Sequence, residues 1–169
     1  MTTQSSKKSN TGWYIAAAII IIIIVVAGVV AYLYTRPPST SSSSTGTVNI
    51  TLYAGKVANN ATAYGFGNSS TTITSPGPSL TVKVGDKVTV TLYNIDTTSG
   101  HNWALVTQKN QITSVVFSAQ IGSAGSPVSY NTHQSTTFTA STAGTYYYVC
   151  QVDLHDVDFG MWGTFTVTS

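Results

Sequence analysis

One cysteine, two histidines and one methionine carry the chemistry that this sequence can support. Cys150, His155 and Met161 lie within 12 residues near the C-terminus, and His101 precedes Cys150 by 49 positions. A thiolate, two imidazoles and a thioether form a soft ligand set that selects copper. We expect Cys150, His101 and His155 to form the plane of one copper site, with Met161 as a weak axial ligand. A site of this kind exchanges single electrons.

Cys150 is the only cysteine of the chain, so it has no partner for an intrachain disulfide. A free thiol in an exported domain would be oxidised, and a bond to a metal removes that problem. The alternative is that Cys150 and Met161 only pack in the core and that His101 is an ordinary loop histidine. His133, in a polar turn, is expected to be solvated and to have no metal role.

The composition excludes a nucleic-acid-binding surface. The net charge is +2, and charged residues are 7% of the chain, against about 25% in ordinary soluble proteins. The chain lacks glutamate, and its polar residues are mostly Ser, Thr, Asn and Gln. Such a surface suits either an acidic medium, in which carboxylates are neutral, or glycosylation. Acceptor patterns for N-glycosylation begin at Asn49, Asn60 and Asn68.

The N-terminal region predicts a membrane anchor. Residues 1–12 form a polar tail with Lys7 and Lys8, and residues 13–34 are uncharged and mostly apolar. A helix of this length reaches about 33 Å, enough for a hydrocarbon core of roughly 30 Å. A cleaved signal peptide is the competing interpretation, although its apolar region would be shorter. The lysines favour a cytoplasmic N-terminus and a single-pass protein of the cell membrane, with its C-terminal domain outside.

A flexible linker and an all-β domain are expected to follow the anchor. Residues 35–46 are rich in Ser, Thr and Pro, which is typical of a flexible tether. Residues 47–169 contain short β-rich runs separated by Gly, Ser, Asn and Pro, and no amphipathic helical stretch. This pattern predicts an antiparallel β-sandwich. The expected strands cover 48–54, 80–84, 87–94, 103–107, 115–118, 135–139, 145–150 and 163–168.

The expected strands would bring the ligands to one end of the sandwich. His101 follows the strand that ends at Asn94, and Cys150 ends a later strand. Met161 immediately precedes the last strand, so the loop that carries His155 would be anchored at both ends. Asn102, directly after the first ligand, is the candidate for a residue that tunes the reduction potential through hydrogen bonds to the ligands.

These motifs resemble the cupredoxins, the small blue copper proteins. The resemblance covers about residues 79–169 and rests on the segments 84–88, 94, 101–102 and 143–150. The membrane-anchored format, the four residues between Cys150 and His155, and the segment 160–163 are most similar to the archaeal sulfocyanins, with rusticyanin and auracyanin as relatives. Five residues separate His155 from Met161, where that group commonly has four. The resemblance implies a Greek-key β-sandwich, one type 1 copper ion and one-electron transfer in an archaeal-type respiratory chain. The domain is expected to be monomeric.

The resemblance also implies a docking face for redox partners such as a cytochrome or a terminal oxidase complex. By this resemblance, the ring edge of His155 approaches the surface, and partners would dock over it. The surrounding loop would supply an apolar contact patch and a rim of carboxylates that attracts a basic partner. The expected patch is Leu154, Val157 and Phe159, and the expected rim is Asp153, Asp156 and Asp158.

Other function classes remain open. A copper enzyme such as a nitrite reductase needs a second copper, usually with three more histidines, and only His133 is left. A dinuclear copper centre of the oxidase-subunit type needs two cysteines. The chain could instead be an electron-donor subunit of a larger copper oxidase complex, or a glycosylated surface or adhesion sandwich without a redox role. We therefore expect an electron carrier and no enzyme activity from this chain alone.

Overall fold

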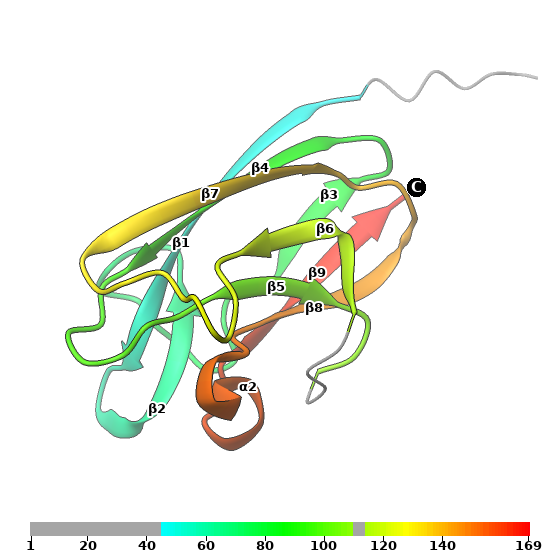
Figure 1. Cartoon of the computed structure of the whole chain (residues 1–169). Coiled ribbons are helices and arrows are strands. Elements are labelled where there is room, and N and C mark those ends of the chain that lie inside the picture. The colour runs from blue at the N-terminus through cyan, green and yellow to red at the C-terminus, as the bar shows by residue number, and fades with distance from the viewer. Residues whose placement is uncertain (1–44, 110–113) are drawn as a thin grey trace, which may run out of the picture. The chain divides into compact units, whose positions relative to one another are not determined.

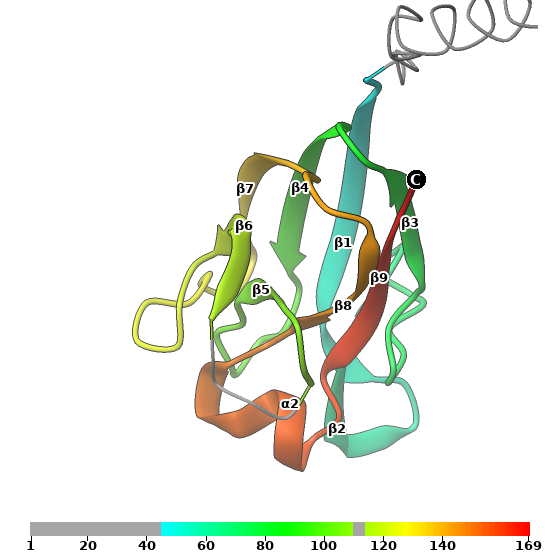
Figure 2. The same ribbon diagram turned by 90° about the vertical axis from the view of Figure 1, so that its right-hand side faces the viewer.

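The computed structural model describes residues 45–109 and 114–169, and within them nine strands form two facing sheets (Figures 1 and 2). The first sheet has the order β2-β1-β4-β7 and the second the order β3-β9-β8-β5-β6. The first consists of β1 (Thr47–Val57), β2 (Asn60–Gly67), β4 (Lys87–Asn94) and β7 (Thr132–Thr139). The second consists of β3 (Leu80–Lys83), β5 (Trp103–Val106), β6 (Val115–Ile121), β8 (Gly144–Val149) and β9 (Trp162–Thr168). The predicted all-β sandwich is confirmed.

The predicted tail, the span 13–34 and almost all of the linker lie outside the described residues. Within the part of the chain that is described, the helices are too short to cross a membrane.

Alternating side chains hold the two sheets together. Along β4, Val88, Val90 and Leu92 are fully buried, while the intervening residues are half-buried. Successive side chains of a strand point to opposite faces, so this alternation places one apolar row against the other sheet. The core between the sheets contains large buried aromatic side chains: Phe66, Trp103, Tyr148 and Phe165.

The expectation that all strands pair antiparallel is wrong for two pairs. β1 runs parallel to β4, from Thr47 beside Lys87 to Ala54 beside Asn94. β3 likewise runs parallel to β9. Apolar and polar residues alternate in the same way in parallel and antiparallel strand pairs, so the pattern does not predict strand direction. The direction depends on the long connections between strands. The remaining pairs between named strands are antiparallel, as expected.

Strand β2 was not predicted from the sequence. In this segment Thr62, Tyr64 and Phe66 alternate with small residues, which is a weak strand signal because glycine disfavours strands. Gly65 is required by a close backbone approach: a Cβ there would lie 2.1 Å from the carbonyl oxygen of Thr74. The small residues of β2 therefore reflect tight packing of its neighbouring loop.

Strand register brings the ligand positions together. β5 pairs with β8 so that Ala104 lies beside Val149, which places the residues just before β5 next to the end of β8. β8 pairs with β9 so that Val149 lies beside Trp162. Beyond that pair, the N–H of Cys150 donates to the carbonyl oxygen of Met161 at 3.1 Å. Neighbouring strands thus position two loops that are far apart in sequence.

The segment between β8 and β9 folds into two short helical turns. They are the 3-10 turn η1 (Val152–Leu154) and the single α-helical turn α2 (His155–Asp158), which lie at one end of the sandwich in Figure 1. Asp153 and Leu154 have left-handed φ angles of 46° and 58°, so the chain reverses sharply between the two turns. This reversal folds the ligand segment back over the strand ends.

Candidate metal centre

Three of the predicted ligands converge on one point. The Nδ1 atom of His101 lies 3.7 Å from Sγ of Cys150, and Nδ1 of His155 lies 3.6 Å from the same sulfur. The ligand atoms of all three residues lie within 4.8 Å of one another. The two imidazoles therefore present the same ring nitrogen to the thiol, which is the arrangement that one shared metal ion requires.

Met161 closes the ligand segment. Its side chain is fully buried, and its N–H donates to the carbonyl oxygen of His155 at 2.9 Å. Together with the bond from Cys150 N–H to the Met161 carbonyl, this interaction fixes Met161 beside the other ligand residues. Gly160, directly before Met161, has a left-handed φ of 70°.

Burial keeps the two histidine ligands neutral and the cysteine ligand protonated. Burial lowers the pKa of His101 to about 4, although the hydrogen bond that His101 donates to Asp96 opposes that effect. Burial also lowers the pKa of His155. Burial raises the pKa of the Cys150 thiol to about 12, so metal binding must displace its proton. The neutral imidazoles offer free lone pairs over a wide pH range.

Asn102 connects the two ligand loops. Its N–H points at Sγ of Cys150 at 3.5 Å, and its side-chain oxygen accepts a hydrogen bond from the N–H of Gln151 at 2.6 Å. Its side-chain nitrogen donates to Oε1 of Gln151 at 3.3 Å. The structure thus places Asn102, a fully buried residue, directly behind the cysteine ligand. An N–H aimed at the sulfur stabilises negative charge there.

Asp96 contacts the ligand His101 on the side away from Cys150 and was not predicted from the sequence. Its Oδ2 atom accepts a hydrogen bond from Nε2 of His101 at 3.2 Å. Burial pushes the pKa of Asp96 upward, but hydrogen bonds from Thr98 and His101 outweigh burial and hold the pKa below its usual value. No motif marks this residue in the sequence, because an aspartate in a polar loop usually caps a turn.

Two aromatic rings enclose the histidine ligands. Tyr64 of β2 stacks on His155, with ring centroids 4.4 Å apart, and meets the His101 ring edge-on at 5.1 Å. Phe159 packs edge-on against His155 at 5.5 Å. His155 is only 3% exposed as a result, rather than presenting a free ring edge. The sequence analysis missed Tyr64 together with its strand.

An open pocket lies outside this aromatic layer. It has a volume of about 560 Å³. Its lining residues are Thr62, Tyr64, Ser99, Asp153, His155, Asp158 and Phe159. His155 lines this pocket together with the rings of Tyr64 and Phe159, so this side of the site faces the surface.

The residues predicted to dock a partner have different environments. Leu154 is 41% exposed, Phe159 is half-buried, and Asp153 and Asp158 are exposed. The side chain of Val157 lies outside the described part of the structure.

The placement of Asp156 in an exposed carboxylate rim is wrong. The residue is 1% exposed. Its N–H donates to the carbonyl oxygen of Cys150 at 3.1 Å, so a backbone hydrogen bond ties the first turn of α2 to the cysteine ligand. An exposed rim could therefore contain Asp153 and Asp158 only.

The donor set fits copper. The described residues bring one thiol, two imidazoles and one thioether into a buried pocket, which matches the preference of copper for soft ligands. When bound, copper supplies one-electron redox chemistry. The protein's own contribution is to hold the ligands at fixed positions, to aim the Asn102 N–H at the sulfur and to exclude water with the aromatic rings.

Comparison with known families and proteins supports the assignment of a copper site. Residues 62–168 match the family described as copper binding proteins, plastocyanin/azurin family. No curated protein matches the chain.

Several solved structures share the fold. Rusticyanin is 26% identical with a TM-score of 0.54, and the match covers 72% of this chain and 77% of rusticyanin. Reduced auracyanin from the photosynthetic bacterium Roseiflexus castenholzii is 22% identical with a TM-score of 0.52. The match covers 72% of this chain and 97% of auracyanin. The multicopper oxidase mgLAC is 26% identical with a TM-score of 0.55, covering 72% of this chain and 39% of the oxidase. With a buried type 1 copper ligand set on this sandwich and a family match across both ligand loops, the chain belongs to the plastocyanin/azurin family of copper binding proteins, the cupredoxins.

Proposed function

We propose that this protein carries single electrons between components of a respiratory chain at the outer face of the cell membrane. The observation that carries the proposal is the burial of the whole ligand set: His101, Cys150 and Met161 are fully buried and His155 is 3% exposed. A substrate would need direct access to the metal, whereas an electron can pass through the edges of packed rings. An enclosed, rigid site therefore favours electron transfer over catalysis.

The finer family assignment is part of the same proposal. The spacing of four residues between Cys150 and His155, the segment 160–163 and the apolar N-terminus support an archaeal sulfocyanin. A surface with few ionisable groups supports work in an acidic medium, in which carboxylates lose their charge. The same surface would also suit glycosylation at Asn49, Asn60 and Asn68, which are all exposed.

Anchoring to the membrane is supported by the composition of residues 13–34 alone. If it is correct, the full-length protein resists extraction from membranes by salt and by carbonate. Deleting residues 1–35 then releases a soluble protein that still binds copper. Recovery of the native protein as a soluble species that begins near residue 36 would instead support a cleaved signal peptide.

The docking face of the proposed carrier is the surface around the pocket beside His155. Leu154 and Phe159 supply apolar area there, and Asp153 and Asp158 supply exposed negative charge. Apolar contact permits close approach of a partner, and the carboxylates mainly set the rate of association. The expected partner is a redox protein with a basic surface, such as a cytochrome or a terminal oxidase complex.

A second candidate function is that of an electron-donor subunit in a larger copper oxidase. The observation that favours it is the match to the multicopper oxidase mgLAC, in which a domain like this one makes up part of a longer chain. The third histidine of this chain, His133, is exposed on β7 and stacks on Tyr93, in a different strand pair from the copper ligands. A catalytic copper would therefore need ligands from another subunit.

One experiment separates the two candidates. The full-length protein, purified in detergent and loaded with copper, is titrated with a one-electron reductant and then mixed with dioxygen or nitrite. A carrier takes up one electron per copper reversibly and turns over neither compound. A membrane complex that co-purifies with this chain and reduces dioxygen would favour the oxidase-subunit function. Reduction of either compound by the isolated chain would contradict the proposal.

A further inference from the structure

The carboxylate of Asp96 makes contacts in two directions. Its Oδ1 atom accepts hydrogen bonds from the N–H of Thr98 at 2.8 Å, from the Thr98 hydroxyl at 2.9 Å and from the N–H of Ser99 at 3.3 Å. Its Oδ2 atom accepts the bond from Nε2 of His101 at 3.2 Å. One oxygen therefore holds the loop, and the other holds the ligand.

The loop that carries Asp96 is itself fixed. The buried side chain of Asn94 accepts a hydrogen bond from the N–H of Asp96 at 2.9 Å. Its Nδ2 group donates to the carbonyl oxygens of Ser99 and Val128, both at 2.9 Å. His101 is bonded to Val128 through both backbone groups. Asp96 and the ligand it contacts are thus attached to one rigid frame, which keeps their separation constant.

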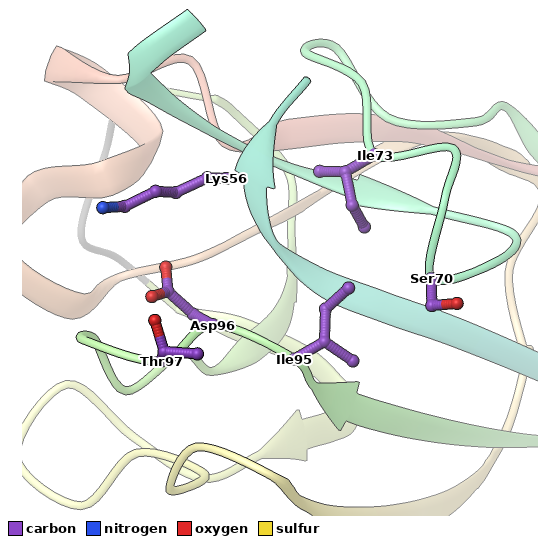
Figure 3. A pocket seen from close by; sticks show the side chains of 6 residues that line it. All are labelled: Lys56, Ser70, Ile73, Ile95, Asp96 and Thr97. Carbon is purple, nitrogen blue, oxygen red and sulfur yellow. The ribbon is translucent and has the colours of Figure 1, made fainter. Parts of the chain in front are cut away.

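Asp96, which contacts the ligand His101, also lines a second surface pocket (Figure 3). This pocket has a volume of about 190 Å³, and Lys56, Ile95 and Thr97 line it beside Asp96. Figure 3 shows Lys56 and Asp96 extending toward the same side of the pocket. The carboxylate itself remains 99% buried, since the Asp96 side chain has 1% exposure. Solvent therefore screens the negative charge of Asp96 only weakly, and the charge acts mainly on His101.

From this arrangement we infer that Asp96 is a positioning residue of the copper site: its carboxylate fixes the ring of His101 with the proton on Nε2 and Nδ1 toward Cys150, and its negative charge favours the oxidised metal. A histidine whose outer nitrogen donates to a carboxylate is oriented and made a stronger ligand. The added negative charge stabilises Cu(II) more than Cu(I), because Cu(II) carries the larger positive charge. Asp96 therefore lowers the reduction potential.

The test is the substitution Asp96→Asn in the full-length protein. The amide has almost the same shape but only one accepting oxygen, so the substitution removes the negative charge and also either the bond from His101 or the bonds that hold the loop. We expect the affinity for Cu(II) to fall by about 10- to 100-fold, with a smaller loss for Cu(I). The reduction potential then rises by about 59 mV for each tenfold change in the ratio of the two affinities.

Two matched variants control for indirect effects. Asp86→Asn makes the same change in a buried aspartate just before the other end of β4, away from the ligands. Lys56→Gln changes the charge of the pocket that Asp96 lines without touching a ligand residue. Both should keep the Cu(II)-to-Cu(I) affinity ratio within about twofold of the wild type. A change in Asp96→Asn no larger than that of either control overturns the inference.

A measurement on the wild type keeps the inference testable if Asp96→Asn does not fold. In nitrogen NMR of the copper-free full-length protein, His101 should be a neutral ring protonated on Nε2, with a ring N–H that exchanges slowly with water. The exposed ring of His133 serves as the internal reference for fast exchange. A His101 ring protonated on Nδ1, or one whose N–H exchanges as fast as that of His133, overturns the inference.

Discussion

Asp86 and Asp96 lie just beyond the two ends of strand β4, and both are buried carboxylates that hold a loop. Asp86 accepts the N–H of Gly46 with one oxygen and the N–H of Lys83 with the other, both at 2.8 Å. Asp96 holds its loop with one oxygen and gives the other to the ligand His101. Asp86 thus stabilises only the fold at the start of β4. Asp96 stabilises both the fold and the metal site at the end of β4.

This difference predicts that stability and redox properties can be changed separately. Substitutions at the end of the sandwich near Asp86 should weaken the fold and leave the copper site intact. Substitutions among the ligands should change the copper site and leave the fold nearly as stable as before.

The largest effect on stability is expected for Phe138→Ala. Phe138 lies beside Val88, at the Asp86 end of β4, and its ring packs on those of Trp103 and Phe165. Removing a buried phenylalanine ring costs about 3–5 kcal/mol. We expect a denaturant midpoint far below that of the wild type, measured on the copper-free protein, and an unchanged visible spectrum after copper loading. A changed spectrum would mean that the two ends are coupled through the core.

At the ligand end, Met161→Leu should change the copper site and leave the stability of the fold nearly unchanged. The two side chains have similar volumes, so the loss of stability should stay below about 1.5 kcal/mol. Loss of the sulfur donor favours Cu(I), so the reduction potential should rise by about 59 mV or more, which is a tenfold change in the redox equilibrium. Voltammetry of the wild type and the variant measures the difference. An unchanged potential would place the Met161 sulfur out of bonding range.

The sequence predicted this ligand set more completely than it predicted the residues around it. Cys150, His155 and Met161 share one short segment, and the rules of strand pairing bring their loop to the edge where a loop before another strand carries His101. The contacts of Asp96 could not be predicted, because only the folded loop brings its carboxylate within 3.2 Å of the His101 ring.

Tyr64 was not predicted as part of the site, and Asp156 was predicted in the wrong environment, for related reasons. Tyr64 belongs to a strand whose small residues hide the β pattern, and its contact with His155 spans 91 positions of sequence. Asp156 looked like a surface residue because isolated carboxylates usually are. The backbone hydrogen bond that ties Asp156 to Cys150 has no sequence signal.

A smaller effect, present at neutral pH and lost at low pH, is expected at Asp86. Hydrogen bonds from the N–H groups of Lys83 and Gly46 hold its pKa below the ordinary value of 3.8. A group whose pKa is depressed by folding stabilises the fold above its unfolded pKa, and this contribution is lost as the pH falls through the folded pKa. Asp86→Asn should therefore have a lower thermal midpoint than the wild type at pH 7. Below about pH 3.8 the two midpoints should converge, and a difference that stays constant with pH would refute this role of the charge.

The smallest effect is expected at the surface beside His155. The double substitution Asp153→Asn with Asp158→Asn removes two exposed charges from the proposed docking face. Electron exchange with a cationic partner should slow at pH 6 and low salt and hardly change at pH 2.5, where carboxylates are neutral. Stopped-flow kinetics over a range of ionic strength measure it, with Asp86→Asn as the control for lost charge elsewhere. An unchanged salt dependence at pH 6 would remove these residues from the docking face.

The visible absorption spectrum of the copper-loaded, oxidised full-length protein tests the central claim most directly. Charge transfer from the Cys150 thiolate to Cu(II) should give an intense blue colour with one copper per chain, and Cys150→Ser should abolish the colour entirely. A wild-type protein that stays colourless with bound Cu(II), or a Cys150→Ser protein that remains blue, would contradict the assignment of a type 1 copper site.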